Sequence, residues 1–280
     1  MGMIMLELAH EDREKLMASD SYLAWEGARI AYRLTGSGSP PVGYAHGVPL
    51  SRAAVRRLGL FDFDALAPGR RLLTYDQRGH GHSTGRPVVE DYRFENFAAD
   101  LLALLDTVDL GEPMDLAGSS LGCDCALRAA IAEPHRFRRL ALLIPPASWE
   151  SRPGRATQWY FDTADDIETL GPAVWREKSV HAEPLPIFAD YPRFDLIPDV
   201  ADELLPSVLR GVGMSELPDP DAIASLRHPT IILAWDTDPL HPVSTAQRLH
   251  ELMPNSTLHV AKSVEDIKSW TGRVAEFFAD

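Results

Sequence analysis

Ser120 occupies the centre of a Gly-Ser-Ser-Leu-Gly segment at residues 118–122. The segment follows a short apolar run and opens a helical stretch, residues 121–132. A strand, a sharp turn and a helix in this order force the apical residue into a strained backbone conformation, and Gly118 and Gly122 allow strand and helix to pack closely. The turn exposes one hydroxyl at a helix N-terminus, where backbone amides and the dipole favour developing negative charge. These residue types and their spacing predict a serine nucleophile.

Three further segments lie in a fixed order around this turn. One apolar strand runs into His-Gly-Val-Pro at residues 46–49, a second runs into residues 76–83, and a third ends shortly before Asp238. Together with the serine turn, these segments resemble the α/β-hydrolase family in motif, order and interval. They cover most of the chain outside residues 149–228. The resemblance implies an α/β fold with a doubly wound, mostly parallel sheet and a helical cap insertion.

The resemblance also implies roles for residues around Ser120. The backbone N–H groups of Val48 and Leu121 would form the oxyanion hole, and loss of one such donor typically raises the barrier by about 3–4 kcal/mol. Asp238 would be the triad acid because it follows the third strand at the family's spacing, whereas the neighbours of Asp236 fit a turn. A base is still needed, since a serine hydroxyl is a poor nucleophile until its proton is removed.

The histidine base is absent from its usual place in the family, after the last strand and before the terminal helix. This chain reads Leu-His-Val-Ala-Lys-Ser-Val-Glu-Asp-Ile over residues 258–267, with Asp266 at the aligned position. His241 is distinctive because it follows Asp238 by three residues, at the catalytic edge of the expected sheet. We expect His241 to be the base, oriented by Asp238 or by Asp266. The alternative is that His241 only lines the loop and that the protein has lost hydrolytic power.

The other histidines fit other roles, and the resemblance implies that the loops of His46, His80 and His82 are structural or support the oxyanion hole. His259 alternates with apolar neighbours on the last strand, which is typical of a satisfied core or surface residue. A metal site at Asp76, His80 and His82 is not expected, because Arg78 intervenes and the glycine-rich loop has a structural explanation. The remaining histidines are His46 in the first loop, His135 and His228 beside turns, His10 and His250 at the surface, and His181 in the cap.

Three functional classes are compatible with these residues. The first, which we favour, is hydrolysis of a small ester, lactone or related acyl compound through an acyl-enzyme. The second is a catalytically impaired protein that binds a small ligand under its cap, and the third is a non-hydrolytic acyltransferase or lyase on the same scaffold. Enzymes of the dehalogenase and epoxide hydrolase type attack with a carboxylate. They are disfavoured because the apex is Ser120, and Asp124 lies one helical turn further on.

The hydrophobic pattern predicts the elements that hold these residues. An opening hairpin turns at Glu26-Gly27, and helical patterns alternate with short apolar strands of the kind that a parallel sheet buries on both faces. In a doubly wound sheet the site lies beyond the carboxyl ends of the strands. The expected strands are residues 22–25, 28–34, 41–45, 71–75, 114–117, 140–144, 230–235 and 257–260, and the expected helices are 94–110, 121–132, 244–252 and 269–278.

The composition changes between Pro145 and His228. Prolines recur there often enough that we expect only short helices and no central strand. With large apolar side chains such as Trp149, Trp159 and Phe188, this segment resembles the cap of the α/β-hydrolase family, which implies an insertion over the site. We expect most of these aromatic side chains to hold the cap together and one or two to face substrate. We therefore expect an N-terminal arm over residues 1–20, a core over 21–148 and 229–280, and a cap over 149–228.

Composition narrows the range of partners. A chain of 280 residues with 45% hydrophobic and 24% charged residues is an ordinary globular protein with a sizeable core. Its formal charge of -14 repels nucleic acids and anionic membrane surfaces, so a small-molecule substrate is the expected partner. The sequence contains neither a glycine-rich phosphate loop nor a dinucleotide fingerprint, so no cofactor is expected, and no metal.

The termini and cysteines suggest where the protein works. Charged residues interrupt the first 18 positions, so we expect neither a signal peptide there nor a membrane span later in the chain. Apolar residues such as Ile4 and Leu8 indicate an arm that either packs on the body or pairs with a second copy in a homodimer. Cys123 and Cys125 point in different directions on a helix and cannot pair. We interpret them as reduced core or elbow-supporting residues of a cytoplasmic protein.

Overall fold

Ser120 directly follows a central strand of one large sheet. The computed structural model describes residues 20–66, 68–151, 154–180, 183–189, 191 and 198–280. The arm expected over residues 1–20 lies outside this range except for Asp20, and so do His10 and His181. Within the described residues, the sheet has eight strands in the order β1-β2-β4-β3-β5-β6-β7-β8. Their bounds are β1 Ser21–Trp25, β2 Ala28–Thr35, β3 Gly38–Ala45, β4 Arg70–Tyr75, β5 Met114–Ser119, β6 Phe137–Leu143, β7 Thr230–Trp235 and β8 Ser256–Ala261.

The sheet begins with an antiparallel hairpin and continues as a parallel sheet. Glu26 and Gly27 both have positive φ, of 42° and 78°, which is the backbone that a two-residue hairpin turn requires. The β1 strand pairs antiparallel with β2, and β2 pairs antiparallel with β4. Every later pairing, from β4–β3 to β7–β8, is parallel. The predicted doubly wound, mostly parallel sheet is thus confirmed.

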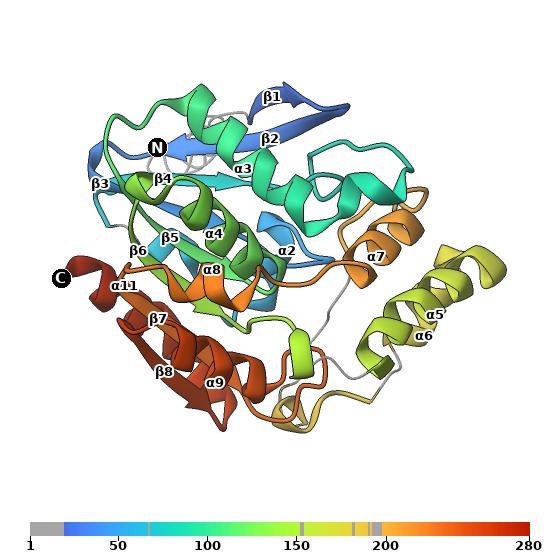
Figure 1. Ribbon diagram of the computed structural model, residues 1–280. Coiled ribbons are helices and arrows are strands. Elements are labelled where there is room, and N and C mark those ends of the chain that lie inside the picture. The colour runs from blue at the N-terminus through green and yellow to red at the C-terminus, as the bar shows by residue number, and fades with distance from the viewer. Residues whose placement is uncertain (1–19, 67, 152–153, 181–182, 190, 192–197) are drawn as a thin grey trace, which may run out of the picture.

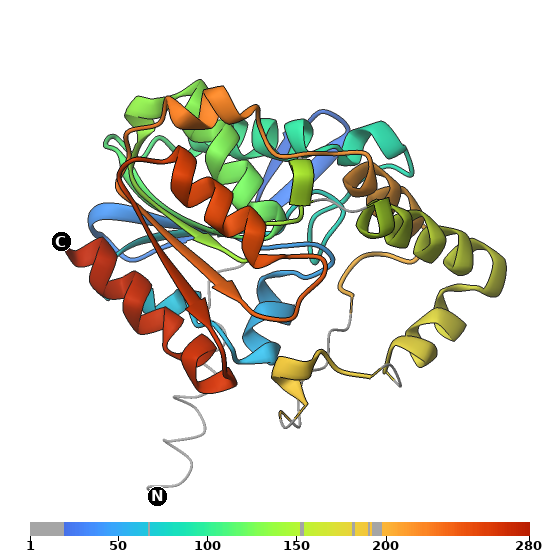
Figure 2. The same cartoon turned by 60° about the horizontal axis from the view of Figure 1, so that its bottom comes forward.

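Helices cover both faces of this sheet, as Figures 1 and 2 show. Along β6, Leu140 and Leu142 join the apolar cluster on the α4 side, whereas Ala141 and Leu143 join the cluster on the α11 side. The carboxyl-terminal halves of these central strands are therefore mostly apolar, because neither face of the sheet meets water. The helices on the α4 side are α3 (Phe94–Val108), α4 (Leu121–Ala132) and α9 (Val243–Leu252), and those on the α11 side are α2 (Arg52–Leu58) and α11 (Trp270–Ala279).

A group of helices lies beyond the carboxyl ends of the strands, on the right of Figures 1 and 2. It comprises α5 (Gly154–Leu170), α6 (Pro172–Val180) and α7 (Leu205–Gly213). The α8 helix (Pro220–Ala224) instead packs on α4 and α9. The expectation of only short helices is wrong for α5, which has 17 residues. Prolines stand on either side of α5 in the sequence and none falls within it, so the helix is not interrupted.

Two short helices were not predicted. The α2 helix begins at Ser51, whose side chain accepts a hydrogen bond from the Ala54 amide. The α10 helix (Val264–Lys268) begins in the same way at Ser263, which accepts from the Asp266 amide. Both are too short for a periodic apolar pattern, and only their N-cap serines mark them in the sequence. No helix in the described part of the chain is long and apolar enough to cross a membrane.

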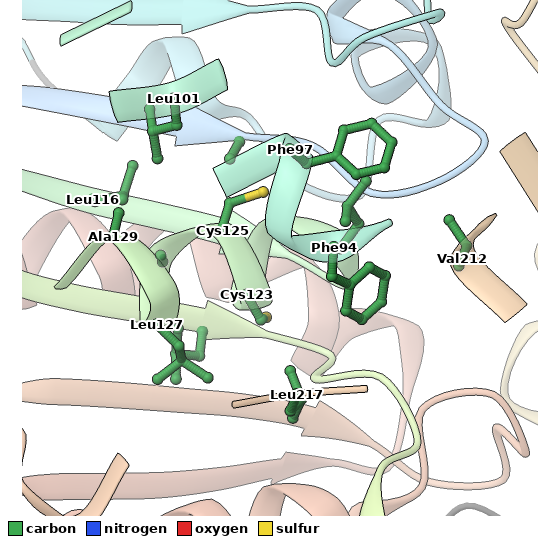
Figure 3. Close-up of a cluster of buried hydrophobic side chains, with 14 of the residues drawn as sticks. Phe94, Phe97, Leu101, Leu116, Cys123, Cys125, Leu127, Ala129, Val212 and Leu217 are labelled. Atoms are coloured by element: carbon green, nitrogen blue, oxygen red, sulfur yellow. The ribbon is translucent and has the colours of Figure 1, made fainter. Parts of the chain in front are cut away.

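Both cysteines lie on α4, in the apolar cluster between α4 and its neighbours (Figure 3). Both are fully buried and unpaired, as predicted. The thiol of Cys123 lies 3.1 Å from the Gly118 carbonyl oxygen and 3.1 Å from that of Leu143. Burial raises the pKa of each thiol, so neither is a ready nucleophile. Cys123 packs directly behind the turn that carries Ser120.

Candidate active site

Ser120 occupies the strained turn that the sequence predicted. Its φ of 52° and ψ of -113° are unfavourable for any residue with a side chain. Its amide donates to the Leu143 carbonyl at 2.9 Å, and its carbonyl accepts from the Cys123 amide at 2.8 Å. A Cβ added at Gly118 would collide with the backbone of Gly122, so strand and helix can approach this closely only where a glycine stands. The turn is held in place by backbone contacts on both sides.

The loop after β3 lies against Ser120. A Cβ added at Gly47 would lie 2.9 Å from the Cβ of Ser120 and 3.5 Å from its Oγ, which places this loop directly beside the hydroxyl. The neighbouring Val48 amide and the Leu121 amide make no hydrogen bond to any described residue. Amides without a partner beside a serine oxygen could receive a developing oxyanion, which is the role that the sequence suggests for them.

His46 anchors the same loop from within the core. Its Nε2 accepts from the Gln77 amide at 2.9 Å, so its proton is on Nδ1, which lies 3.0 Å from the Gly47 carbonyl oxygen. The Gln77 side chain returns a hydrogen bond to the His46 carbonyl at 3.2 Å. Burial lowers the pKa of His46, which keeps the ring neutral in this arrangement. His46 is therefore a structural residue, as expected.

His241, from the loop after β7, contacts Ser120 at the carboxyl end of β5, and Asp238 contacts His241. The Nε2 atom of His241 lies 2.8 Å from Ser120 Oγ, and its Nδ1 lies 2.7 Å from Asp238 Oδ2. Since the carboxylate can only accept, Nδ1 carries the proton and leaves Nε2 free to accept from the serine hydroxyl. The structure thus brings together the nucleophile, acid and base that were predicted from the sequence.

The loop between β7 and α9 is shaped to hold these two side chains. Thr237 has a φ of 71°, which is strained for a β-branched residue and reverses the chain after β7. The Leu240 amide donates to Asp238 Oδ1 at 2.8 Å, and the Leu240 carbonyl accepts from the Ala147 amide at 2.8 Å. The loop is therefore tied both to its own carboxylate and to the segment that follows β6.

Asp238 is ionised despite being buried. Burial opposes the charge, but His241, the Leu240 amide and the Trp235 indole all donate to the carboxylate or attract it, and together they lower its pKa. Only 7% of Asp238 and 7% of Ser120 is exposed to solvent. A charged carboxylate in such a dry position can stabilise an imidazolium on His241 far better than it could in water.

The other carboxylates that the sequence offered lie outside this arrangement. Asp266 accepts a hydrogen bond from the Lys262 amide at 3.1 Å, at the start of α10, and has no contact with His241. Asp236 is exposed and accepts from the Thr237 amide at 2.9 Å. Asp124 is buried and pairs with Arg128 on α4, and burial raises its pKa to about 7. Of the two acids proposed to orient His241, the structure places Asp238 in contact.

A cluster of Asp20, Asp76 and His82 has the spacing of a metal site, but it already contains a cation. The Arg52 guanidinium donates to Asp20 at 3.0 Å and to Asp76 at 2.9 Å. Burial opposes the charge on Asp76, but the hydrogen bonds from Arg52 outweigh it and lower the pKa of the carboxyl. The cluster is a buried ion-pair network that fixes the loop after β4.

One contact of the site was missed by sequence reasoning. The indole Nε1 of Trp235 lies 3.2 Å from Asp238 Oδ2. Trp235 is the last residue of β7, three positions before the acid. The signal in the sequence was a large side chain with a hydrogen-bond donor at the end of the strand that precedes Asp238.

Comparisons with known proteins agree with this geometry. A family model described as the alpha/beta hydrolase fold matches residues 40–169. The 2-hydroxy-6-oxo-2,4-heptadienoate hydrolase of Pseudomonas putida is 32% identical over 215 residues, which cover 70% of this chain and 71% of that protein.

Solved structures of similar shape include a hydrolase from Pseudomonas aeruginosa PA01, with a TM-score of 0.76 and 23% identity over 94% of this chain and 100% of that chain. The enol-lactonase from Burkholderia xenovorans LB400 has a TM-score of 0.74 and 20% identity over 93% of this chain and 100% of that chain. At these identities the structures show a shared fold, while the sequence match to the Pseudomonas putida protein shows kinship. The chain belongs to the α/β-hydrolase family.

Proposed function

We propose that the protein is a serine hydrolase that cleaves a small neutral ester, lactone or related acyl compound through an acyl-enzyme at Ser120. The observation that carries this proposal is the unbroken hydrogen-bond chain from Ser120 Oγ through His241 to Asp238. A histidine that merely lined its loop would have no reason to place one ring nitrogen on a carboxylate and the other on a strained serine. This favours an enzyme over an impaired ligand-binding protein.

The reaction follows from the positions of these groups. His241 Nε2 takes the proton from Ser120 Oγ as the oxygen attacks the substrate carbonyl, and Asp238 stabilises the imidazolium that forms. The amides of Val48 and Leu121 would bind the oxyanion of the tetrahedral intermediate. The imidazolium then gives its proton to the leaving group, which departs and leaves an acyl-enzyme. Water activated by the same imidazole releases the acid and restores Ser120.

Charge and kinship support the substrate class. A formal charge of -14 repels anionic compounds from the molecule, which favours neutral substrates. The 32% identical Pseudomonas putida protein is named as a hydrolase, which supports hydrolysis over acyl transfer or elimination. The same name specifies an oxo-dienoate, so such an anionic compound belongs in the test panel as the competing possibility.

The test combines labelling of the serine with turnover. The wild-type protein is treated with a serine-reactive fluorophosphonate and assayed on p-nitrophenyl acetate, a neutral lactone and 2-hydroxy-6-oxo-2,4-heptadienoate. We expect labelling at Ser120 and faster turnover of the neutral compounds. Ser120→Ala should abolish both. Ser119→Ala is the matched control, because Ser119 Oγ lies 3.0 Å from the Tyr44 hydroxyl and outside the proposed triad.

The outcomes separate the functional classes. Labelling at Ser120 with release of the acid would support the hydrolase, whereas a ligand-binding protein would leave Ser120 unlabelled. Products formed with an added alcohol or amine in preference to water would indicate an acyltransferase. A folded wild-type protein that neither reacts with the phosphonate nor turns over a compound would overturn the proposal.

A further inference from the structure

We propose that Trp235 is a positioning residue for catalysis: its indole N–H holds the Asp238 carboxylate in the orientation that aligns His241 with Ser120. This inference rests on the proposed function. Trp235 touches no reacting atom, and it acts through the carboxylate.

Three donors converge on the carboxylate of Asp238. Oδ2 receives the imidazole Nδ1–H of His241 at 2.7 Å and the indole Nε1–H of Trp235 at 3.2 Å, and Oδ1 receives the Leu240 amide at 2.8 Å. With donors at both oxygens, the carboxylate cannot rotate without breaking at least one bond. The indole thus adds a fixed second donor to the oxygen that holds the base.

The indole itself is clamped in place. It stacks on the ring of Trp270 from α11, with centroids 5.6 Å apart and planes 13° from parallel. Phe188, from the segment that links α6 to α7, packs edge-on at 5.3 Å. Trp235 is 8% exposed, and its strand position is fixed by pairing with Ala261 of β8. A ring packed on two sides cannot turn its N–H away from the carboxylate.

The acid and base need such support because they share one short loop. Asp238 and His241 are three residues apart, and the loop begins with the strained Thr237. A shift of this loop would move both side chains together and carry Nε2 of His241 away from the Ser120 hydroxyl. Trp235 comes from the sheet instead of the loop, and so ties the pair to a rigid reference. His241 also contacts the indole ring edge-on, with centroids 6.5 Å apart.

The chain offers a matched pair of substitutions. Trp235→Phe removes the N–H bonded to Asp238 and keeps an aromatic ring in the stack. Trp270→Phe makes the same chemical change in the partner ring, whose Nε1 is buried and has no partner among the described residues. We expect Trp235→Phe to lower kcat about 10- to 150-fold, the effect of one hydrogen bond to a charged group, with KM changed less than about twofold. Trp270→Phe should retain kcat within about threefold.

A coupled measurement separates positioning from loss of packing. The rate of Ser120 labelling by the fluorophosphonate is compared for Trp235→Phe in the wild-type and in the Asp238→Asn background. If the indole acts through the carboxylate, the effect of Trp235→Phe should largely vanish once Asp238 is replaced, because the two losses are not additive. The indole N–H resonance of Trp235 should also shift in Asp238→Asn, while that of Trp270 stays in place.

Two outcomes overturn the inference while leaving the proposed function intact. They are equal losses in Trp235→Phe and Trp270→Phe, and a Trp235→Phe effect that stays the same in the Asp238→Asn background. Failure of the proposed function looks different, since neither the wild type nor any variant would then label at Ser120. The resonance shift can be measured in that case too, because it needs no turnover. Circular dichroism confirms that each variant is folded.

Discussion

Ser120 and His241, the proposed nucleophile and base, are held in place by different kinds of interaction. Ser120 is fixed by backbone geometry: glycines on either side, amide hydrogen bonds and a sheet–helix contact with no spare volume. His241 is fixed by side-chain hydrogen bonds within a loop, reinforced by one indole from the sheet. Changes in the turn should therefore damage folding first, whereas changes in the loop should damage activity and leave the fold intact.

The largest expected effect is a loss of activity when His241, in the loop between β7 and α9, is replaced. His241→Ala should lower kcat/KM on p-nitrophenyl acetate by roughly 10⁴-fold or more, because the serine loses its base. Thermal unfolding should change far less than activity, because His241 lies in the loop between β7 and α9 and is only partly buried. His259→Ala on β8 is the control, because it removes the histidine nearest to the family's usual position, and it should remain active. Wild-type-like activity in His241→Ala would dispose of the proposed triad.

Substitutions in the turn around Ser120 should instead lower the stability of the fold. A methyl group at Gly122 would overlap the carbonyl of Ala45, so Gly122→Ala should lower the free energy of unfolding by about 3 kcal/mol. Gly272→Ala is the matched control in α11, where an added Cβ meets nothing within 4 Å, and it should be neutral or stabilising by up to about 1 kcal/mol. Urea unfolding followed by circular dichroism measures both. Equal stabilities for the two variants would contradict the steric account of the turn.

The smallest effect concerns the pH dependence of stability. His80 is fully buried beside His46, and burial followed by repulsion from His46 lowers the pKa of His80 to about 3, against 6.5 for a free imidazole. The folded state therefore binds fewer protons than the unfolded state below pH 6.5, so the contribution of His80 is complete above that pH and is lost as the pH falls towards 3. His80→Asn keeps a donor for the Arg78 carbonyl and does not titrate.

Relative to His80→Asn, the wild type should lose about 1–2 kcal/mol of unfolding free energy between pH 7 and pH 5. Asp100 and Asp124, whose pKa values burial raises to about 6 and about 7, titrate in the same range with the opposite sign. They are present in both proteins, so their contributions cancel in the difference. Urea midpoints at several pH values give the comparison. A difference that stays constant with pH would show that His80 is not held neutral by burial.

Sequence reasoning recovered what depends on local pattern. The strand, turn and helix around Ser120 were predicted because glycine spacing and apolar runs are properties of adjacent residues. Asp238 and His241 were found because a strand end and a loop can be located along the chain. Kinship with the α/β-hydrolase family placed the first of these two residues, and elimination among the histidines suggested the second.

Contacts between side chains could not be predicted in the same way. The bond from Trp235 to Asp238 depends on the reversal at Thr237, a backbone conformation that the sequence does not favour. The pairing of Arg52 with Asp76 joins residues 24 positions apart, on different elements. Such contacts are set by tertiary packing, and residue types alone show only that the groups are able to bond.

The proposed acid and base, Asp238 and His241, are the first and last of four consecutive residues. Four neighbouring codons therefore encode both, and recombination elsewhere in the gene leaves them together. In a relative whose histidine lies on another loop, two distant regions must be inherited together. Here a single short segment, transferred to another protein, would carry both the acid and the base. The strand before it would have to end in a tryptophan whose indole N–H can donate to the carboxylate.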